Sequence, residues 1–127
     1  MHLLLDTHVL LWWLDDSSRL GPTGRARIAD PRARVFVSAA TGCEISIKRA
    51  LGKLRAPADL DAVLDRAGLE RLAITFRHGE AAGDLPPLHR DPFDRMLVAQ
   101  ARLERLALVT ADEAIRAYDV ETIDPTR

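Results

Sequence analysis

The sequence predicts an α/β domain with a mostly parallel sheet covered by helices on both faces. Segments typical of strands alternate with helical segments along the 127 residues, which is the pattern of a parallel sheet with crossover helices. The strand segments are short apolar runs, as expected where both faces of a sheet are buried. No repeat, low-complexity tract or linker interrupts this pattern, so we expect one domain over residues 1–127.

The first half of the chain contains two expected strands, the apolar run Leu3–Leu5 and the β-branched and aromatic run Val35–Val37. Asp15–Gly24 is rich in Asp, Ser, Gly and Pro, which predicts a loop. The expected helices are Thr7–Leu14, Arg25–Ala29, Ala39–Leu54 and Asp59–Ala67. In the third of them, apolar residues spaced by three or four predict one stripe facing the core: Ala40, Cys43, Ile47, Leu51 and Leu54.

The second half continues the alternation. The expected elements are strands at Leu72–Ile74, Leu106–Val109 and Val120–Ile123, a helix at Arg77–Ala82 and a loop over Leu85–Arg90. Asp91-Pro92 is a strong helix start, because Asp is a good N-cap and proline suits the first helical position. That helix should run to about Glu104. Thr110 and Glu113 form a capping-box pattern, which predicts one more helix after the fourth strand.

Charge and composition limit the classes of function. The net charge is -1 and the isoelectric point about 6.4, so any binding of nucleic acid must depend on a local patch. One cysteine, Cys43, excludes a disulfide within the chain and fits a reducing cytosol. The N-terminus lacks a basic region, and no apolar run approaches the roughly 20 residues that span a bilayer. We therefore expect a cytoplasmic protein.

Two acidic residues directly follow expected strands. Asp6 comes after Leu3–Leu5, and Asp112 comes shortly after the fourth strand. In an open parallel sheet, ligand sites lie beyond the carboxyl ends of the strands, so both are placed for chemistry. Each also has a structural interpretation that the sequence leaves open. Asp6 suits the N-cap of the next helix, and Asp112 suits the positive end of a helix dipole.

Two further acids lie on expected helices. Asp94 falls in the first helical turn after Asp91-Pro92, where it would also complement the helix dipole. Glu44 lies at the border of the apolar stripe and can pair with Lys48 one turn later, although such a pair contributes only about 0.2–0.5 kcal/mol. Several carboxylates brought together need a cation, and oxygen ligands favour Mg²⁺ or Mn²⁺. The four acids together therefore predict a metal site that acts on phosphates.

At these residues the sequence resembles the PIN domains, and specifically the VapC-type toxin ribonucleases of bacterial toxin–antitoxin pairs. The resemblance covers nearly the whole chain. Its most specific segments are Asp6-Thr7-His8 and His89-Arg90-Asp91-Pro92-Phe93-Asp94-Arg95, and the others are Val37–Ala40 with Glu44, Ile45 and Lys48, Leu51–Leu54, and Leu108–Asp112.

The resemblance implies a fold, a reaction and partners. The fold is a PIN-like three-layer α/β/α sandwich with a central, mostly parallel sheet. Asp6, Glu44, Asp94 and Asp112 would be the catalytic residues and would bind one or two Mg²⁺ or Mn²⁺ ions. Water activated by the metal would hydrolyse an RNA phosphodiester, leaving a 5′-phosphate and a 3′-hydroxyl. Similar proteins form homodimers and are inhibited by a VapB-like antitoxin.

Cys43 departs from this resemblance, because similar sequences usually carry a bulky aromatic residue just before the helix glutamate. We interpret Cys43 as a smaller core residue of the apolar stripe. Trp12 and Trp13 are expected in the core or a dimer interface and not as platforms for base stacking, because they lie in an apolar helix. His8 and His89 are expected to be structural histidines or to contact substrate or a proton. A basic run is either a solvated face or a grip on RNA phosphates: Lys48, Arg49, Lys53 and Arg55.

Three other functions suit an α/β domain with acidic residues at its strand ends. A phospho-receiver domain is disfavoured because Asp6 is followed by Thr7 and no lysine occurs after Lys53. A PIN-like module that only binds a partner is disfavoured by the presence of all four acids. Activity on DNA stays open, because carboxylate–metal chemistry acts on the phosphate and does not recognise the 2′-hydroxyl.

Overall fold

The computed structural model describes all 127 residues and contains one five-stranded sheet in the order β3-β2-β1-β4-β5, with every neighbouring pair parallel. Its strands are β1 Leu3–Leu5, β2 Val35–Ser38, β3 Glu70–Leu72, β4 Ala107–Val109 and β5 Thr122–Ile123. Because β1 is central and pairs with both β2 and β4, the carboxyl ends of these three strands meet at one edge.

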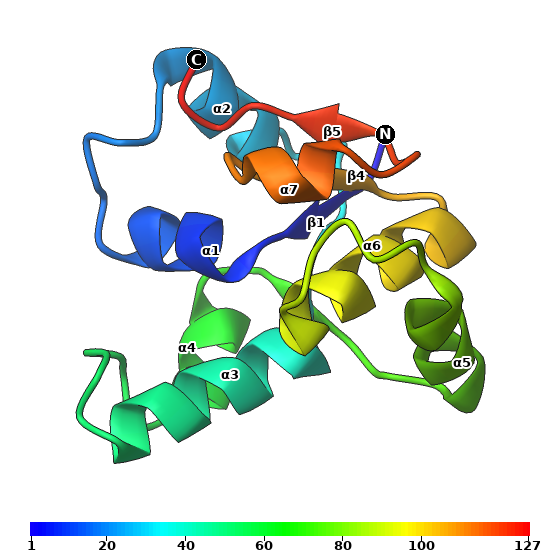
Figure 1. Cartoon of the computed structure of the whole chain (residues 1–127). Coiled ribbons are helices and arrows are strands. Elements are labelled where there is room, and N and C mark those ends of the chain that lie inside the picture. The colour runs from blue at the N-terminus through cyan, green and yellow to red at the C-terminus, as the bar shows by residue number, and fades with distance from the viewer.

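Seven helices cover the sheet (Figure 1). They are α1 Thr7–Leu14, α2 Pro22–Ala29, α3 Ala39–Ala50, α4 Leu60–Arg66, α5 Phe76–Asp84, α6 Pro92–Glu104 and α7 Glu113–Arg116. The first four helices contribute to one core cluster and the last three to the other. The result is the predicted α/β/α sandwich. No helix is both long enough and apolar enough to cross a membrane.

The central strand supplies both cores. Leu3 and Leu5 pack with Val9, Leu10 and the α1–α4 layer, whereas Leu4 packs with the α5–α7 layer. All three leucines are almost fully buried. An apolar run without alternation is therefore explained by burial of both faces, as the sequence predicts.

The helix α2 begins three residues earlier than expected, inside the segment predicted to be a loop. Pro22 occupies its first turn, and the C-terminal segment caps it, since the N–H groups of Thr23 and Gly24 donate to the Arg127 carbonyl. A Cβ at Gly21 would lie 2.3 Å from the Arg127 backbone, so only glycine fits there. This cap depends on residues about a hundred positions away, and a local sequence pattern does not reveal it.

Two boundaries predicted for the middle of the chain are wrong. The helix α3 ends at Ala50 and not at Leu54, because Gly52 adopts φ +71° and closes a Schellman motif in which the Lys53 N–H donates to the Lys48 carbonyl at 2.9 Å. The third strand is Glu70–Leu72 and not Leu72–Ile74. Its partner β2 ends opposite Leu72, at Ser38, so the residues after Leu72 have no strand to pair with.

The apolar stripe predicted for α3 is only partly in the core. Ile47 and Leu51 are 47% and 62% exposed, and Cys43 is exposed as well. The buried face of α3 is instead formed by Ala40, Thr41, Glu44 and Ile45. The helix is therefore rotated relative to the expectation, and the interpretation of Cys43 as a core residue is wrong.

Candidate active site at the carboxyl ends of the strands

Asp6 lies directly beyond β1 and is 5% exposed. One carboxylate oxygen, Oδ1, accepts the Val9 N–H at 2.8 Å and caps α1. The other, Oδ2, accepts the Thr110 hydroxyl at 2.5 Å. The N-cap interpretation of Asp6 is therefore correct, yet each oxygen keeps a second lone pair for another partner.

Asp112 follows the neighbouring strand β4 and caps α7, because its Oδ1 accepts the Ala114 N–H at 2.8 Å. The capping box predicted for Thr110 and Glu113 is wrong, since the cap is Asp112. The Thr110 hydroxyl instead joins two of the acids: it donates to Asp6 and accepts the Asp112 N–H at 3.0 Å. Thr110 is fully buried, and sequence reasoning missed this linking role.

Glu44 lies on α3 and is 4% exposed, so it belongs to the buried face of the helix and not to its border. Its Oε1 accepts the Thr7 hydroxyl at 2.7 Å, and its Oε2 accepts from Lys48 Nζ at 2.7 Å. The predicted Glu44–Lys48 pair is present, but it is partly buried and not a surface pair. The hydrogen bond to Glu44 raises the pKa of Lys48, and the negative charges of Glu44, Asp91 and Asp94 add to this effect.

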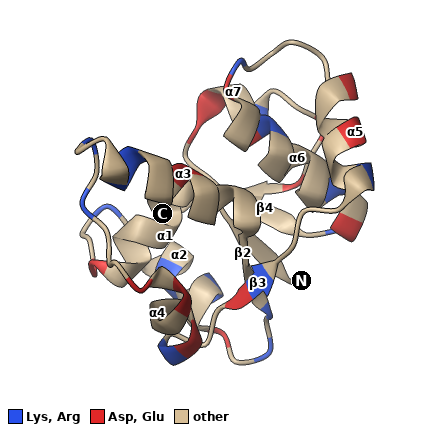
Figure 2. Cartoon of the chain, turned by 90° about the horizontal axis from the view of Figure 1, so that it is seen from below, with Lys and Arg blue, Asp and Glu red and all other residues tan.

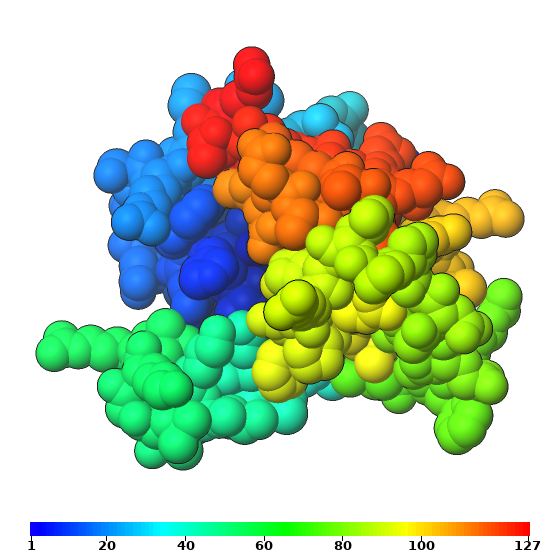
Figure 3. Space-filling model, viewed as in Figure 1, coloured from blue at the N-terminus to red at the C-terminus, as the bar shows by residue number.

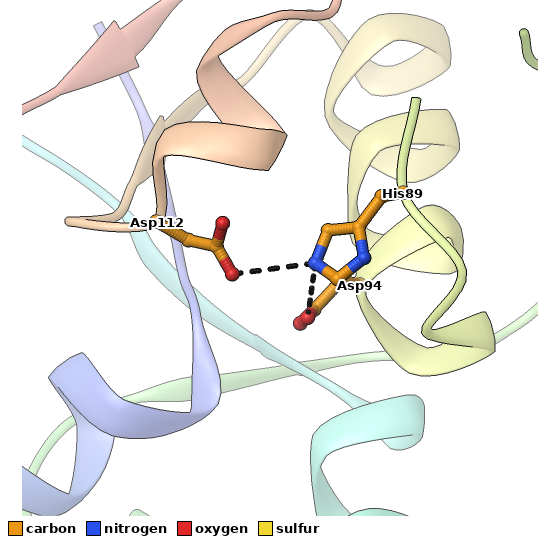
Figure 4. Close-up of side chains that lie close together, drawn as sticks. All are labelled: His89, Asp94 and Asp112. Carbon is orange, nitrogen blue, oxygen red and sulfur yellow. Dashed lines mark hydrogen bonds and ion pairs between the residues drawn. The ribbon is translucent and has the colours of Figure 1, made fainter. Parts of the chain in front are cut away.

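Asp94 lies in the first turn of α6, as predicted, and its carboxylate meets the His89 side chain (Figure 4). His89 Nε2 is 3.0 Å from Asp94 Oδ2 and 3.3 Å from Asp112 Oδ2. The Asp91 carboxylate caps α6, since its Oδ1 accepts the N–H groups of Phe93 and Asp94, and it lies outside the group formed by His89, Asp94 and Asp112. The loop before α6 thus places an imidazole between two of the predicted acids.

The hydrogen bonds of His89 define its tautomer. Its Nδ1 faces the Asp91 N–H at 3.2 Å and so acts as an acceptor. The ring proton therefore lies on Nε2, which donates toward both carboxylates. A histidine that binds a metal usually donates its other ring N–H to an oxygen, and here that nitrogen faces a donor. His89 is therefore arranged as a hydrogen-bond donor to the acids and not as a metal ligand.

Arg95 and Tyr118 hold the loop that carries His89. The Arg95 guanidinium donates to backbone carbonyls of Ala82, Gly83, Leu85, Pro86 and His89. The Tyr118 hydroxyl donates to the Pro86 carbonyl at 2.7 Å and accepts the His89 N–H at 2.9 Å. Arg95 therefore positions the loop, and its donors are occupied by the backbone.

The acids perturb one another electrostatically. Burial, the charge of Asp91 and those of Glu44 and Asp112 raise the pKa of Asp94 to about 7, against the opposing effect of His89. Burial also raises the pKa of Asp6, and Asp112 adds to this effect, whereas the hydrogen bonds from Thr110 and Val9 lower it. For both Asp6 and Asp94, burial and neighbouring acids therefore disfavour the ionised form of the carboxyl group.

Side-chain atoms of His89, Asp94 and Asp112 all lie within 4.8 Å of one another, so the Asp94 and Asp112 carboxylates are close enough to share a metal ion if His89 moves aside. Asp6 and Glu44 are not part of this tight group, but Asp6 is joined to Asp112 through Thr110. Acidic residues occur on α3 and at the starts of α6 and α7 in Figure 2. The donor set consists of carboxylate oxygens with incomplete charge neutralisation, which suits a divalent cation.

The predicted basic run lies at the end of α3 and in the loop that follows (Figure 2). Within it, Lys48 is paired with Glu44, and Arg49 donates to the Pro57 carbonyl at 2.6 Å. Lys53 and Arg55 are exposed and make no ion pair. The largest hollow of the molecule, about 560 Å³, lies between α3, α4 and β3, and none of the four acids lines it.

A parallel α/β sandwich with buried carboxylates beyond its central strands defines a protein with an acidic site at the sheet edge. The model of the PIN-domain family matches residues 3–121, and the chain therefore belongs to the PIN-domain family. The resemblance stated from the motifs is confirmed. No curated protein matches the chain in sequence.

Solved structures share the whole fold. The chain is similar to a chain of VapBC2 from Rickettsia felis bound to a promoter DNA fragment, with 16% identity, a TM-score of 0.72 and coverage of 97% of this chain and 98% of that chain. It is also similar to a chain of VapBC-1 from nontypeable Haemophilus influenzae, with 20% identity, a TM-score of 0.70 and coverage of 100% of both chains. A toxin–antitoxin complex from Klebsiella pneumoniae matches at 17% identity and 0.66, with 97% of each chain covered.

Proposed function

We propose that this protein is a Mg²⁺-dependent endoribonuclease and the toxin of a bacterial toxin–antitoxin pair. The observation that carries the proposal is the convergence of Asp6, Asp94 and Asp112, from the starts of α1, α6 and α7, at one edge of a PIN-domain sheet. Solved structures with a similar fold come from toxin–antitoxin complexes, and this supports the proposed role as a toxin.

Asp6, Glu44, Asp94 and Asp112 would hold the metal, with Mn²⁺ as an alternative to Mg²⁺. When bound, a divalent cation supplies an activated water and stabilises charge on the phosphate oxygens. The chain's own residues orient these acids. Thr110 fixes Asp6 relative to Asp112, and Thr7 with Lys48 fixes both oxygens of Glu44. Such supporting hydrogen bonds define the positions of metal ligands.

The proposed partners are RNA as the substrate, a VapB-like antitoxin and a second copy of the chain in a homodimer. The proposed location is the cytoplasm, where both RNA and a co-expressed antitoxin are present. Expression of the chain alone should arrest bacterial growth, and co-expression of the protein encoded by a neighbouring reading frame should restore it.

Cleavage of RNA by the purified chain tests the proposed activity. Wild-type protein with Mg²⁺ should cut unstructured RNA and leave 5′-phosphate ends, and EDTA should abolish the cut. Asp6→Asn should reduce the rate by at least a hundredfold while it keeps the cap on α1, since asparagine is an equally good N-cap. Asp119→Asn is the matched control, because Asp119 is exposed and lines a hollow that none of the four acids lines.

The outcomes separate the alternatives. Equal cleavage of single-stranded DNA would favour a nuclease that does not select RNA. Absence of both cleavage and Mn²⁺ binding would overturn the proposal and favour a PIN-like module that only binds a partner.

A further inference from the structure

A second hollow adjoins the acids on the side of α1. It has a volume of about 280 Å³, and its lining residues are Asp6, His8, Trp12, Arg19, Ala111 and Asp112. One wall is thus the acidic edge of the sheet, and the other comes from α1 and the loop after it. In Figure 3, the blue surface of α1 meets the orange surface of the α7 region on this face. We call this hollow the α1 cleft.

The α1 cleft contains a cation without an acidic partner. The Arg19 guanidinium lies 5.7 Å from the centroid of the Trp12 ring, within the range of a cation–π interaction. Arg19 takes part in no ion pair, and only its backbone N–H makes a hydrogen bond. Arg25, close by in the chain, is instead paired with Asp16 at 2.6 Å. The donors of the Arg19 side chain are therefore open to a ligand.

The rest of this wall is aromatic and anchored. Trp12 is half-buried and packs against the larger core cluster, so its ring is held in place. His8 is exposed, with its ring centroid 6.5 Å from that of Trp12. An arginine held on an indole, with a second ring beside it, offers donors to a phosphate and flat faces to a sugar or base. Trp12 thus packs against the core, as expected, and also lines the α1 cleft.

We propose that the α1 cleft binds the nucleotide next to the scissile phosphate, with Arg19 contacting its phosphate and Trp12 and His8 contacting its sugar or base. This inference rests on the proposed function, because it assumes that an RNA phosphate lies at Asp6 and Asp112. A second phosphate close to those carboxylates is repelled unless a cation balances it. Arg19 is the one arginine lining the cleft, and it supplies that charge.

Tryptophan fluorescence provides a binding test, because the chain has only Trp12 and Trp13. Trp13→Phe leaves Trp12 as the sole reporter, and Asp94→Asn in the same protein prevents cleavage. Titration with an unstructured RNA octamer in Mg²⁺ should quench Trp12 to saturation, and adding Arg19→Gln should weaken binding at least fivefold. A protein with Trp12→Phe, in which Trp13 reports, should not respond.

Kinetics of the active enzyme give an independent readout. Arg19→Gln should raise KM about five- to tenfold with kcat within twofold, as expected for loss of one phosphate contact that acts on binding. In Arg19→Gln, the slope of log K against log salt concentration should also become less steep by about 0.7, the value expected for one lost phosphate contact on a single strand. Arg27→Gln is the matched control. Arg27 is exposed and makes no ion pair, and none of the four acids of the candidate site lines the hollow beside it.

These results distinguish the α1 cleft from the proposed function. If wild-type protein does not cut RNA, the proposed function fails, whereas RNA-dependent quenching of Trp12 would still support the cleft. If wild-type protein cuts RNA but Arg19→Gln leaves KM and the salt slope unchanged, the cleft proposal alone is overturned. Quenching of Trp12 by a glutamate-rich peptide but not by RNA would also overturn it.

Discussion

Asp6 and Asp112 each serve the backbone and the site at the same time. Asp6 and Asp112 cap helices with Oδ1 and turn Oδ2 toward Thr110 and His89. A helix start fixes the main chain, and a cap fixes the side chain's rotamer, so the carboxylate is held before any ligand binds. The capping and site interpretations of these residues are compatible, because they use different lone pairs.

The sequence predicts which acids reach the sheet edge, because strand ends and helix starts can be recognised from local patterns. It does not predict the hydrogen bonds between them. Thr110 and Asp6 are 104 positions apart, and Thr7 and Glu44 are 37 apart. These contacts depend on the register of β1 against β4 and on the rotation of α3. No pattern within either segment contains that information.

Thr110→Val tests the link between Asp6 and Asp112. Valine keeps the shape but removes the donor to Asp6 and the acceptor for the Asp112 N–H. We expect a loss of about 2 kcal/mol of unfolding free energy and an affinity for Mg²⁺ about tenfold weaker. Urea denaturation and calorimetric Mg²⁺ titration measure the two effects. Thr126→Val, which removes an exposed bond to Asp124, should change neither; unaltered Mg²⁺ affinity in Thr110→Val would contradict the positioning role.

His89→Ala tests whether the imidazole competes with a cation. His89 donates toward Asp94 and Asp112, and a cation bound between them must replace those interactions. We expect Mn²⁺ to bind about fivefold more tightly to His89→Ala, which corresponds to about 1 kcal/mol for the lost donor. Electron paramagnetic resonance of free Mn²⁺ measures this affinity. His2→Ala, at the opposite end of β1, is the control; weaker Mn²⁺ binding would identify His89 as a ligand.

At the scale of elements, α3 shows what periodicity can and cannot predict. A spacing of three or four between residues correctly predicts that this segment is a helix. Two different faces of α3, however, carry residues with this spacing. The structure buries the one with Ala40, Thr41, Glu44 and Ile45. Burial of Glu44 is tolerated because Thr7 and Lys48 satisfy both of its oxygens, and these partners are not visible to a hydrophobic pattern.

Other elements follow from local signals to different degrees. The helix α6 spans Pro92–Glu104 as predicted, because Asp91 and Pro92 are strong start signals in the adjacent sequence. The sequence pattern places the edge strand β3 two residues too late, because the strand contains Glu70 and Arg71 and lacks an apolar run. Edge strands often carry charges, which weakens their sequence signal.

Ile47→Ser tests the rotation of α3. Ile47 is 47% exposed, so its replacement should change the unfolding free energy by less than about 0.5 kcal/mol. Ile45→Ser on the same helix is the matched variant. Ile45 is fully buried, and its replacement should cost at least about 3 kcal/mol. Urea denaturation of both variants checks this, and similar losses in the two would contradict the described orientation of α3.

At the scale of the whole molecule, the net charge of -1 conceals a strong local imbalance. The sheet edge gathers four carboxylates, and most of the ion pairs lie elsewhere on the surface. Burial, and to a smaller extent the neighbouring acids, raise the pKa values of Asp6 and Asp94, so keeping both groups ionised at neutral pH destabilises the folded state. We therefore expect a bound cation at this edge of the sheet to stabilise the folded protein.

The pH dependence of unfolding should reveal this imbalance. The pKa of Asp94 rises from 3.8 to about 7 on folding, so between these values the folded state holds a proton that the unfolded chain has lost. The resulting stabilisation is fully present below pH 3.8 and is lost as the pH rises through 7. From pH 5 to pH 8 the protein in EDTA should lose about 2 kcal/mol of unfolding free energy through this group.

Asp94→Asn and Mg²⁺ should each reduce this loss, for different reasons. Asparagine does not titrate, so the variant in EDTA should be more stable than wild type at pH 8 and should show a shallower fall. Mg²⁺ binds the ionised carboxylates of the native state and should stabilise wild-type protein more at pH 8 than at pH 5. Urea denaturation across this pH range, with and without Mg²⁺, measures both effects. An equal fall in wild type and Asp94→Asn would show that Asp94 is not the group responsible, and equal stabilisation by Mg²⁺ in both proteins would place the cation away from Asp94.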